Sequence, residues 1–513
     1  MGSCAPRLAV LACLLAPAAA RAQLAPVGVP GGVVRVDLDG EVDIWDHRRR
    51  DGQREPLGAD LSSPAFGSDL LPSLGDADAR IGRITGLPGY RLNLGALATD
   101  VLADQGTGVL GLALGLTRSI TIFGRVPLVR ARVQPHIALD PAGADAGLNP
   151  GSTQQGTFFQ QFDASLAALG ARIAAGDFDG DPALKARAQS TLTAAGALRD
   201  DLFGLLSDGA TASPFVPTLT SPAGAAIGAR VASLQTSLAG DFGIAGFTST
   251  PVLPTAAITS TELVGLLADP SGPIVTRPGE SKITFRGDAE AGVALTLVDR
   301  WDRGRRRGGL RAAVEGLVRF PTGRVAQPDR LFTLGTGDGQ TDVELRITTD
   351  LGAGAWGLRA EGMYNRQLAA DYIVRVAPPT EPLAPIDLLS AVRRDPGDVV
   401  SLAVRPFYRL APALAIQGTA MQWSRGEDQV SYLTPADEIP GVDAAVLAQD
   451  SKASATVLGI GVTYSSAGRF GPGGRGMPVD ASWSYERVVR ATGGIVPDRH
   501  AMRARLRFYV DLF

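Results

Sequence analysis

Apolar and charged residues alternate with a period of two over long stretches of this chain. In the segment 282–298, one set of alternate positions is apolar (Ile283, Phe285, Ala289, Ala291, Val293, Leu295 and Leu297) and the other is mostly polar or charged (Lys282, Thr284, Arg286, Asp288, Glu290 and Thr296). Successive side chains of a strand point to opposite faces, so the pattern predicts ribbons with one apolar and one ionic side. The same alternation recurs at 33–46 and 502–512. A transmembrane β-barrel needs this pattern, with lipid outside and water inside.

A soluble β-sandwich also alternates, because one face packs on a core and the other meets water. Strand length argues against it here. Several of these stretches run ten or more residues, close to the roughly 9–11 that cross a bilayer and about twice the usual strand of roughly 5–6. The chain also ends on Phe513, an aromatic terminus that resembles the last strand of Gram-negative outer-membrane proteins. We therefore predict an all-β fold, a transmembrane antiparallel β-barrel.

The alternation predicts thirteen candidate strands, at 33–46, 90–101, 108–116, 119–133, 282–298, 309–320, 341–351, 355–365, 398–410, 413–424, 453–464, 479–489 and 501–513. Single-chain bacterial barrels have an even number of strands. The barrel has twelve if 33–46 does not span fully, and fourteen if another strand lies within 47–89 or 245–280. We favour twelve.

The lengths of the connections predict the orientation of the barrel. Short connections at 116–119, 352–354 and 411–412 fall at one end, and long ones at 321–340, 366–397, 425–452 and 490–500 fall at the other. Outer-membrane barrels have short periplasmic turns and long extracellular loops. We therefore place the short connections and the C-terminus on the periplasmic side.

Between residues 135 and 280 the strand pattern stops and helical spacing begins. Phe158, Phe162 and Leu169 fall on one helical face. Two further helices are predicted to open at Asp181-Pro182 and Ser221-Pro222, each an N-cap followed by proline at the first helical position. This helical insert in one long loop divides the chain into 1–22, 23–134, 135–280 and 281–513. An extracellular cap and a plug in the lumen both fit the sequence.

The N-terminus predicts export. Arg7 precedes an apolar run at 8–15, and Ala20-Arg21-Ala22 forms a small-x-small site, so we expect a signal peptide, residues 1–22, cleaved before Gln23. Its removal takes two arginines and no acid from a chain of formal charge −3, which leaves −5 and makes nucleic acid an improbable partner. The partners we expect are outer-membrane lipid, small-molecule solutes and the barrel-assembly machinery.

The sequence contains no recognisable catalytic or metal-binding set. His47, His136 and His500 are isolated, and Asp177, Asp179 and Asp181 have calcium-loop spacing but lack its turn glycine and bidentate glutamate. We therefore predict no enzyme activity, no metal and no cofactor. Aromatic residues near strand ends are expected to form a girdle at the membrane interfaces: Trp45, Tyr90, Trp301, Phe320, Trp356, Tyr364, Tyr408, Trp423, Tyr464, Trp483 and Tyr485.

The main candidate site is a mixed ionic lumen. Its predicted lining charges are Arg286, Asp288, Glu290, Arg311, Glu315, Arg319, Asp342, Glu344, Arg346, Arg359, Glu361, Arg405, Arg409, Arg503, Arg505 and Arg507, together with Asp480 and Glu486. Such charges can line a channel, or they can pair across a narrow barrel and fill it. The two functions that follow are a porin-like channel for small solutes and a structural or surface-interaction barrel with a filled lumen and a helical binding cap.

Two stretches resemble a known group of barrels. Residues 115–129 (GLTRSITIFGRVPLV) look like a first periplasmic hairpin, and residues 318–323 (VRFPTG), followed by 334–337 (LGTG) and Asp342, look like a strand-loop-strand segment. Both resemble porin-like Gram-negative outer-membrane barrels, among them transporters of the phenol-degradation MetA-pathway group and, more distantly, channels of the fatty-acid-transporter type. The resemblance covers about 108–134 and 282–365 and implies passive movement of small, hydrophobic molecules. The helical insert departs from the pattern of that group.

Overall fold

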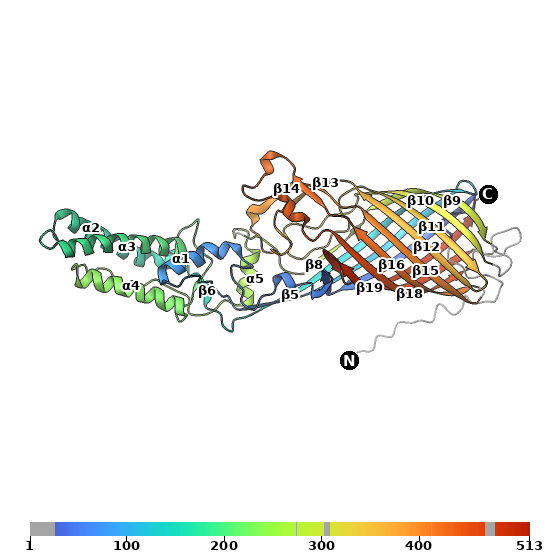
Figure 1. Cartoon of the computed structure of the whole chain (residues 1–513). Helices are drawn as coiled ribbons and strands as arrows, with labels where there is room; N and C mark the ends of the chain where they lie inside the picture. The colour runs from blue at the N-terminus through green and yellow to red at the C-terminus, as the bar shows by residue number, and fades with distance from the viewer. Residues whose placement is uncertain (1–25, 273, 302–307, 412, 467–477, 513) are drawn as a thin grey trace.

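Twelve antiparallel strands close into a barrel in the computed structural model, which describes residues 26–272, 274–301, 308–411, 413–466 and 478–512 (Figure 1). β8 and β9 pair with β5 one after the other and form one wall strand, and pairing of β4 with both β1 and β5 closes the ring. The count of twelve is confirmed. The wall strands, in chain order, are β1 (Val33–Trp45), β4 (Ala96–Gly115), β5 (Ile120–Asp140), β8 (Ser281–Arg286) with β9 (Ala289–Trp301), β10 (Gly309–Phe320), β11 (Asp342–Ala353), β12 (Trp356–Gln367), β15 (Val399–Ala411), β16 (Leu414–Arg425), β18 (Ala453–Ser465), β19 (Val479–Thr492) and β21 (His500–Asp511).

The reason for twelve differs from the one predicted. The segment 33–46 forms β1, which pairs along its whole length with β21 and β4. The segments 90–101 and 108–116, counted as two strands, instead contribute to the single twenty-residue strand β4. The sequence suggested a break because Gln105, Gly106 and Thr107 interrupt the apolar run. The ladder bonds are made by the backbone, however, and Gln105 and Thr107 point into the lumen, where polar side chains are tolerated.

The outer face of the wall is an apolar band. Leu112, Leu128, Leu297, Leu402 and Ile460 are 56%, 59%, 62%, 66% and 64% exposed, which suits lipid and not water. Phe320 and Tyr364 mark the long-loop edge of this band, and Trp356, whose ring centroid lies 4.7 Å from that of Tyr408, marks the short-loop edge. The girdle prediction is wrong for four residues: Trp45, Trp301 and Trp423 are on the inner face, and Tyr90 lies outside the barrel.

A β-bulge divides the segment 282–298 into two parts with opposite phases. Leu128 pairs with Arg286, but Arg125 pairs with Glu290, so the β8–β9 side carries one extra residue at Gly287-Asp288. Since Leu128 points outward, Lys282, Thr284 and Arg286 also point outward, and Ile283 and Phe285 point inward. The predicted face is therefore wrong for 282–286 and holds for the outward residues Val293, Leu295 and Leu297.

The two ends of the barrel differ as the connection lengths predicted. The turns between β4 and β5 and between β11 and β12 lie at one end, together with the start of β1 and the end of β21. The other end carries the long connections, with small sheets and 3₁₀ turns. These are β2 (His47–Arg50), β3 (Gln53–Pro56), β13 (Ala370–Arg375), β14 (Leu389–Asp395), β17 (Gln429–Tyr432), β20 (Ile495–Pro497), η2 (Ala59–Leu61), η3 (Pro72–Leu74), η4 (Ile386–Leu388), η5 (Pro435–Asp437) and η6 (Ala444–Ala448). The predicted signal peptide 1–22 and the terminal Phe513 lie outside the described residues.

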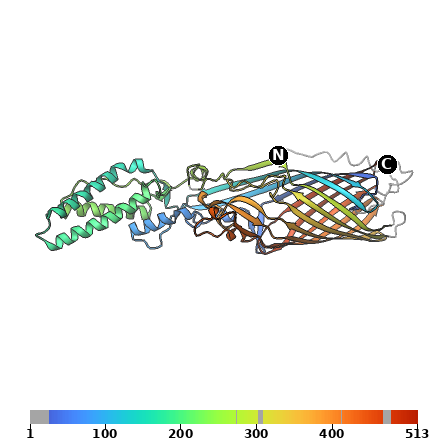
Figure 2. The same ribbon diagram turned by 90° about the horizontal axis from the view of Figure 1, so that it is seen from above.

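A helical unit projects from the long-loop end, beyond the barrel and away from its lumen (Figures 1 and 2). Its elements are α1 (Gly75–Thr85), α2 (Ser152–Ala175), α3 (Pro182–Leu206), α4 (Pro222–Gly240), α5 (Ser260–Ala268), β6 (Ala146–Leu148) and β7 (Phe215–Pro217). The predicted N-caps are present: Asp181 accepts from the amides of Ala183 and Leu184, and Ser221 accepts from that of Gly224. Among the described helices, none is both long and apolar enough to cross a membrane.

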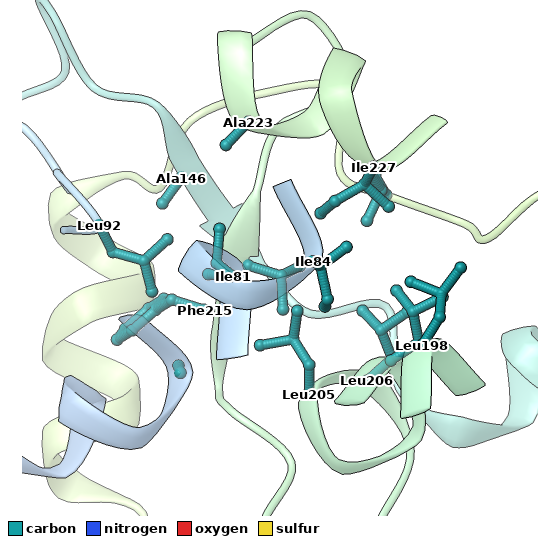
Figure 3. Packing of buried hydrophobic residues seen from close by; sticks show 14 of the residues in the cluster. Ile81, Ile84, Leu92, Ala146, Leu198, Leu205, Leu206, Phe215, Ala223 and Ile227 are labelled. Carbon is teal, nitrogen blue, oxygen red and sulfur yellow. The ribbon is translucent and has the colours of Figure 1, made fainter. Parts of the chain in front are cut away.

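The core of the helical unit is built mainly from two separate chain connections, and Leu97 of β4, Leu139 of β5 and Leu383 of the connection between β12 and β15 complete it. Ile81 and Ile84 of α1, from the connection between β1 and β4, pack among Leu198, Leu205 and Ile227, which belong to the connection between β5 and β8 (Figure 3). The sequence predicted one insert at 135–280. It missed α1, which is short and contains three charged residues in its first six positions.

Candidate channel lumen

Two adjoining cavities of about 430 and 840 Å³ lie inside the barrel. Both are lined by Asp39, Glu41, Arg346, Glu361 and Arg505, so they meet in mid-lumen. From there the smaller cavity runs along the β15–β21 side of the wall, and the larger one reaches toward the long-loop end at 335–338. The barrel interior therefore contains open space between its charged side chains.

The structure places all but one of the predicted lining charges on the inner face of the wall. These are Asp288, Glu290, Arg311, Glu315, Arg319, Asp342, Glu344, Arg346, Arg359, Glu361, Arg405, Arg409, Arg503, Arg505 and Arg507, with Asp480 and Glu486. Arg286 is the exception. It lies on the outer face because the bulge at Gly287-Asp288 reverses the phase of β8.

On the β9–β12 wall, arginines and carboxylates form an interlocked network. Arg319 donates to Glu290 at 3.1 Å and to the fully buried Asp342 at 2.8 Å. Nearer the short-loop end, Asp350 is held by Arg311 at 2.8 Å and Arg359 at 2.7 Å. Paired, buried charges of this kind stiffen the wall and leave no head group free to meet a solute.

A second ionic row follows the seam between the first and last strands. Asp37 pairs with Arg507 at 3.2 Å, Asp39 with Arg505 at 2.7 Å, and Glu41 with Arg503 at 2.9 Å. These residues are directly opposite one another in the β1–β21 register. The alternation at 33–46 puts these three acids on the charged face of the strand, but it does not identify their partners.

The charged heads differ in their access to water. The side chains of Arg311 and Arg507 are 7% and 10% exposed, whereas those of Arg346, Arg503 and Arg505 are 36%, 44% and 49% exposed. The last three line the cavities. They are therefore the lumen cations that a passing solute could contact.

Sequence analysis missed Arg125 as a lining residue. It reaches Glu290 at 3.4 Å and Glu315 at 3.3 Å from β5. The alternation of β5 is ambiguous because its inner face also carries apolar residues, Phe123 and Val129 among them. Glu290 and Glu315, which pair with Arg125, could have indicated that Arg125 points into the lumen. That pairing cannot be read from the sequence, because the bulge shifts the register between β5 and β9.

The loop at 321–341 folds over the long-loop mouth and is fastened at the bulge. Asp288 accepts from the amides of Gly323 at 2.8 Å and Asp338 at 3.1 Å. A side chain on Gly287 would come within 3.0 Å of the Thr336 carbonyl, so the loop can lie this close only because residue 287 is glycine. Burial, together with the nearby carboxylates of Asp342 and Asp288, raises the pKa of Asp338 to about 6.

Residues 26–32 occupy the short-loop mouth. Arg35 donates to the Val27 carbonyl at 3.0 Å, and the Val29 amide donates to Thr121 at 2.9 Å. Val29 is 2% exposed and packs against Phe123 and other inner-wall residues. A third cavity, of about 470 Å³, lies beside this segment at the short-loop end. The signal for this segment in the sequence is weak: a Gly- and Pro-rich stretch directly ahead of β1.

No family model matches this chain, and no curated protein matches it. Among solved structures, it is similar to the COG4313 outer membrane channel from Pseudomonas putida F1, with 10% identity, a TM-score of 0.42 and coverage of 95% of this chain and 100% of that one. It is also similar to the translocator domain of autotransporter NalP from Neisseria meningitidis, with 10% identity, a TM-score of 0.29 and coverage of 94% and 89%. A third similar structure is the Pseudomonas putida toluene transporter TodX, with 10% identity, a TM-score of 0.26 and coverage of 94% of this chain and 90% of that one. Because these TM-scores are below 0.5, the function proposed below rests on the side chains of this chain.

Proposed function

We propose that this protein is a passive channel for small solutes in the Gram-negative outer membrane. The observation that carries the proposal is the pair of adjoining cavities in mid-lumen, into which the partly exposed heads of Arg346, Arg503 and Arg505 project. A lumen evolved only for stiffness would bury its charges as Arg311 and Arg507 are buried. Open space beside water-accessible cations instead provides a polar path inside an apolar band.

The lining favours small molecules that combine an apolar part with a polar group. At the long-loop end the part of the inner face formed by β1, β4 and β5 is apolar, with Trp45, Val101 and Val133 packed together. Deeper in the lumen the wall becomes ionic. A solute with both characters can contact each zone in turn, and cavities of about 430 and 840 Å³ limit its size.

Residues 26–32 act as the gate in this proposal. The segment is held by a few hydrogen bonds and one small apolar cluster, so its displacement breaks few contacts. Gly28 lies close against the wall, since a Cβ there would lie 2.3 Å from the hydroxyl of Thr296. A large side chain at position 28 should therefore expel the segment from the mouth.

The test is single-channel conductance in planar bilayers. Gly28→Leu and a variant lacking residues 26–30 should both conduct more than wild type. The matched control is Gly316→Leu, because Gly316 lies on the outer face with no neighbour within 4 Å of an added Cβ. Neutralising Arg503 and Arg505 together should shift ion selectivity toward cations, since both heads reach the cavity.

Properly inserted variants that neither conduct ions nor pass small solutes would contradict the channel. The alternative function, a structural or surface-interaction barrel whose helical unit binds a partner, would then take its place.

A further inference from the structure

The outer face of β5 and β8 carries four cations above the apolar band: Arg130, Arg132, Lys282 and Arg286. Arg286 pairs with Leu128, and moving away from the band Arg130 pairs with Thr284 and Lys282 with Arg132. Arg130, Lys282 and Arg286 are all exposed and point away from the lumen. We call these three residues the outer basic patch. Sequence analysis could not find the patch, because it depends on the bulge that turns β8 outward.

Among the described residues, none of the three members of the outer basic patch has a carboxylate partner. Within the described residues, Arg130 and Lys282 make no hydrogen bond or ion pair, and Arg286 donates only to the Thr322 carbonyl, at 3.1 Å. Comparable cations nearby are paired: Arg132 binds Asp104 at 2.7 Å, and Arg366 on β12 binds Asp398 at 2.8 Å. Like charges on adjacent strands repel each other, so an anion between them would stabilise this arrangement.

The position of the patch identifies the kind of anion. Leu128 and Val126, just below it on the outer face of β5, are 59% and 53% exposed and lie within the band that faces lipid chains. Phe320 marks the same edge of the band on β10. The cations therefore lie at the level of lipid head groups, where phosphate is the anion that arginine and lysine bind best.

There is also room for a head group beside the patch. Gly106 is the residue opposite Arg130 on β4, and nothing lies within 4 Å of a Cβ built there. The guanidinium of Arg130 is thus uncovered on the β4 side as well as toward solvent.

We propose that the outer basic patch binds the phosphate groups of an anionic lipid in the outer leaflet of the membrane, with the lipid chains lying against Leu128 and Val126. The proposal rests on the outer-membrane location given above. It assigns a role to three cations that do not line the lumen and have no carboxylate partner.

The test measures lipid binding to the folded barrel in neutral detergent micelles by native mass spectrometry. The probe is lipid A with two phosphates, compared with the same lipid after enzymatic removal of its phosphates. Wild type should bind the phosphorylated lipid, and the double variant Arg130→Gln/Lys282→Gln should bind it at least about tenfold more weakly. The control Arg366→Gln removes an outer-face cation that already has a carboxylate partner and should bind as wild type does. Heat-modifiable gel migration verifies that each variant is folded.

Equal affinity of wild type and double variant for the phosphorylated lipid would overturn the proposal, as would equal binding of the dephosphorylated lipid. Inorganic phosphate that competes at micromolar concentration would indicate a site for free phosphate and would also overturn it. If the double variant does not fold, Lys282→Gln alone serves, with a smaller loss expected. Conductance of the same samples separates the two proposals, because the double variant should conduct as wild type does.

Discussion

The effect of a residue in this barrel depends on the face of the strand it occupies. Leu295 lies in the middle of β9, is 43% exposed on the outer face, and has the outward residues Ile120 and Val314 beside it. Leu295→Arg should lower the free energy of unfolding in lipid bilayers by about 2–4 kcal/mol, because a charge near the bilayer midplane must be removed from water. Urea titration followed by tryptophan fluorescence measures the change. Gln417→Arg is the control, since Gln417 lines the aqueous cavity and its replacement should change stability much less.

Asp338 should make the loop at 321–341 sensitive to pH. Its pKa is raised to about 6 by burial and by Asp342 and Asp288, with Arg319 opposing the shift. The folded loop therefore binds the proton more tightly than the unfolded chain does, and the resulting stability is full below about pH 4 and is lost as pH rises through about 6. Wild-type conductance should rise over this range as the loop loosens, measured in bilayers at fixed salt.

Asp338→Asn should flatten this part of the pH profile, because an amide does not titrate. A profile that keeps its rise near pH 6 in the Asn variant would assign the titration to another group.

At the scale of elements, the seam between β1 and β21 should be stabilised by its charges. Three acids on β1 face three arginines on β21. A slip by two residues in one direction would place Asp39, Glu41 and Asp43 opposite the same arginines, so the charges stabilise the seam without alone fixing its register. Asp39→Arg places two arginines opposite each other and should destabilise the barrel by about 1 kcal/mol, since the pair is partly exposed to water. The double reversal Asp39→Arg/Arg505→Asp should recover most of this loss, as judged by unfolding in urea. Equal destabilisation in the single and double variants would show that the Asp39–Arg505 pair does not stabilise the seam between β1 and β21.

The strands could be predicted from the sequence more fully than the site. Period-two alternation depends only on which face meets lipid, so most wall strands could be predicted from the order of apolar and polar residues. The bulge at Gly287-Asp288 left no comparable sign, because the apolar and polar residues of 282–298 alternate along the sequence without a visible break. That single residue reversed Arg286 and created the outer basic patch. The pairing partners of Arg125 and Asp39 were also out of reach, because they join strands far apart in the chain.

At the scale of the whole molecule, two connections supply most of the core of the helical unit, and Leu97 and Leu139 of the wall strands join that core to the barrel. Removing residues 150–245 alone, within the predicted insert, would delete α2, α3 and α4 and leave the apolar face of α1 without cover. We expect that variant to be degraded readily by added protease at 66–94, although its barrel strands can still pair.

Removing both residues 67–93 and residues 142–272 should instead leave a folded barrel without the helical unit. Phe66 and Leu94 are already joined by a backbone hydrogen bond of 2.8 Å, so residues 67–93 can be replaced by a two-residue turn. A flexible linker of about ten residues can replace 142–272, because closure entropy changes only slowly with loop length. This double deletion should show heat-modifiable migration and resist protease as the wild-type barrel does, whereas the 150–245 deletion should not. If the double deletion is also degraded, the helical unit is required for barrel assembly. If it folds and conducts more than wild type, the unit restricts access to the lumen from the long-loop side.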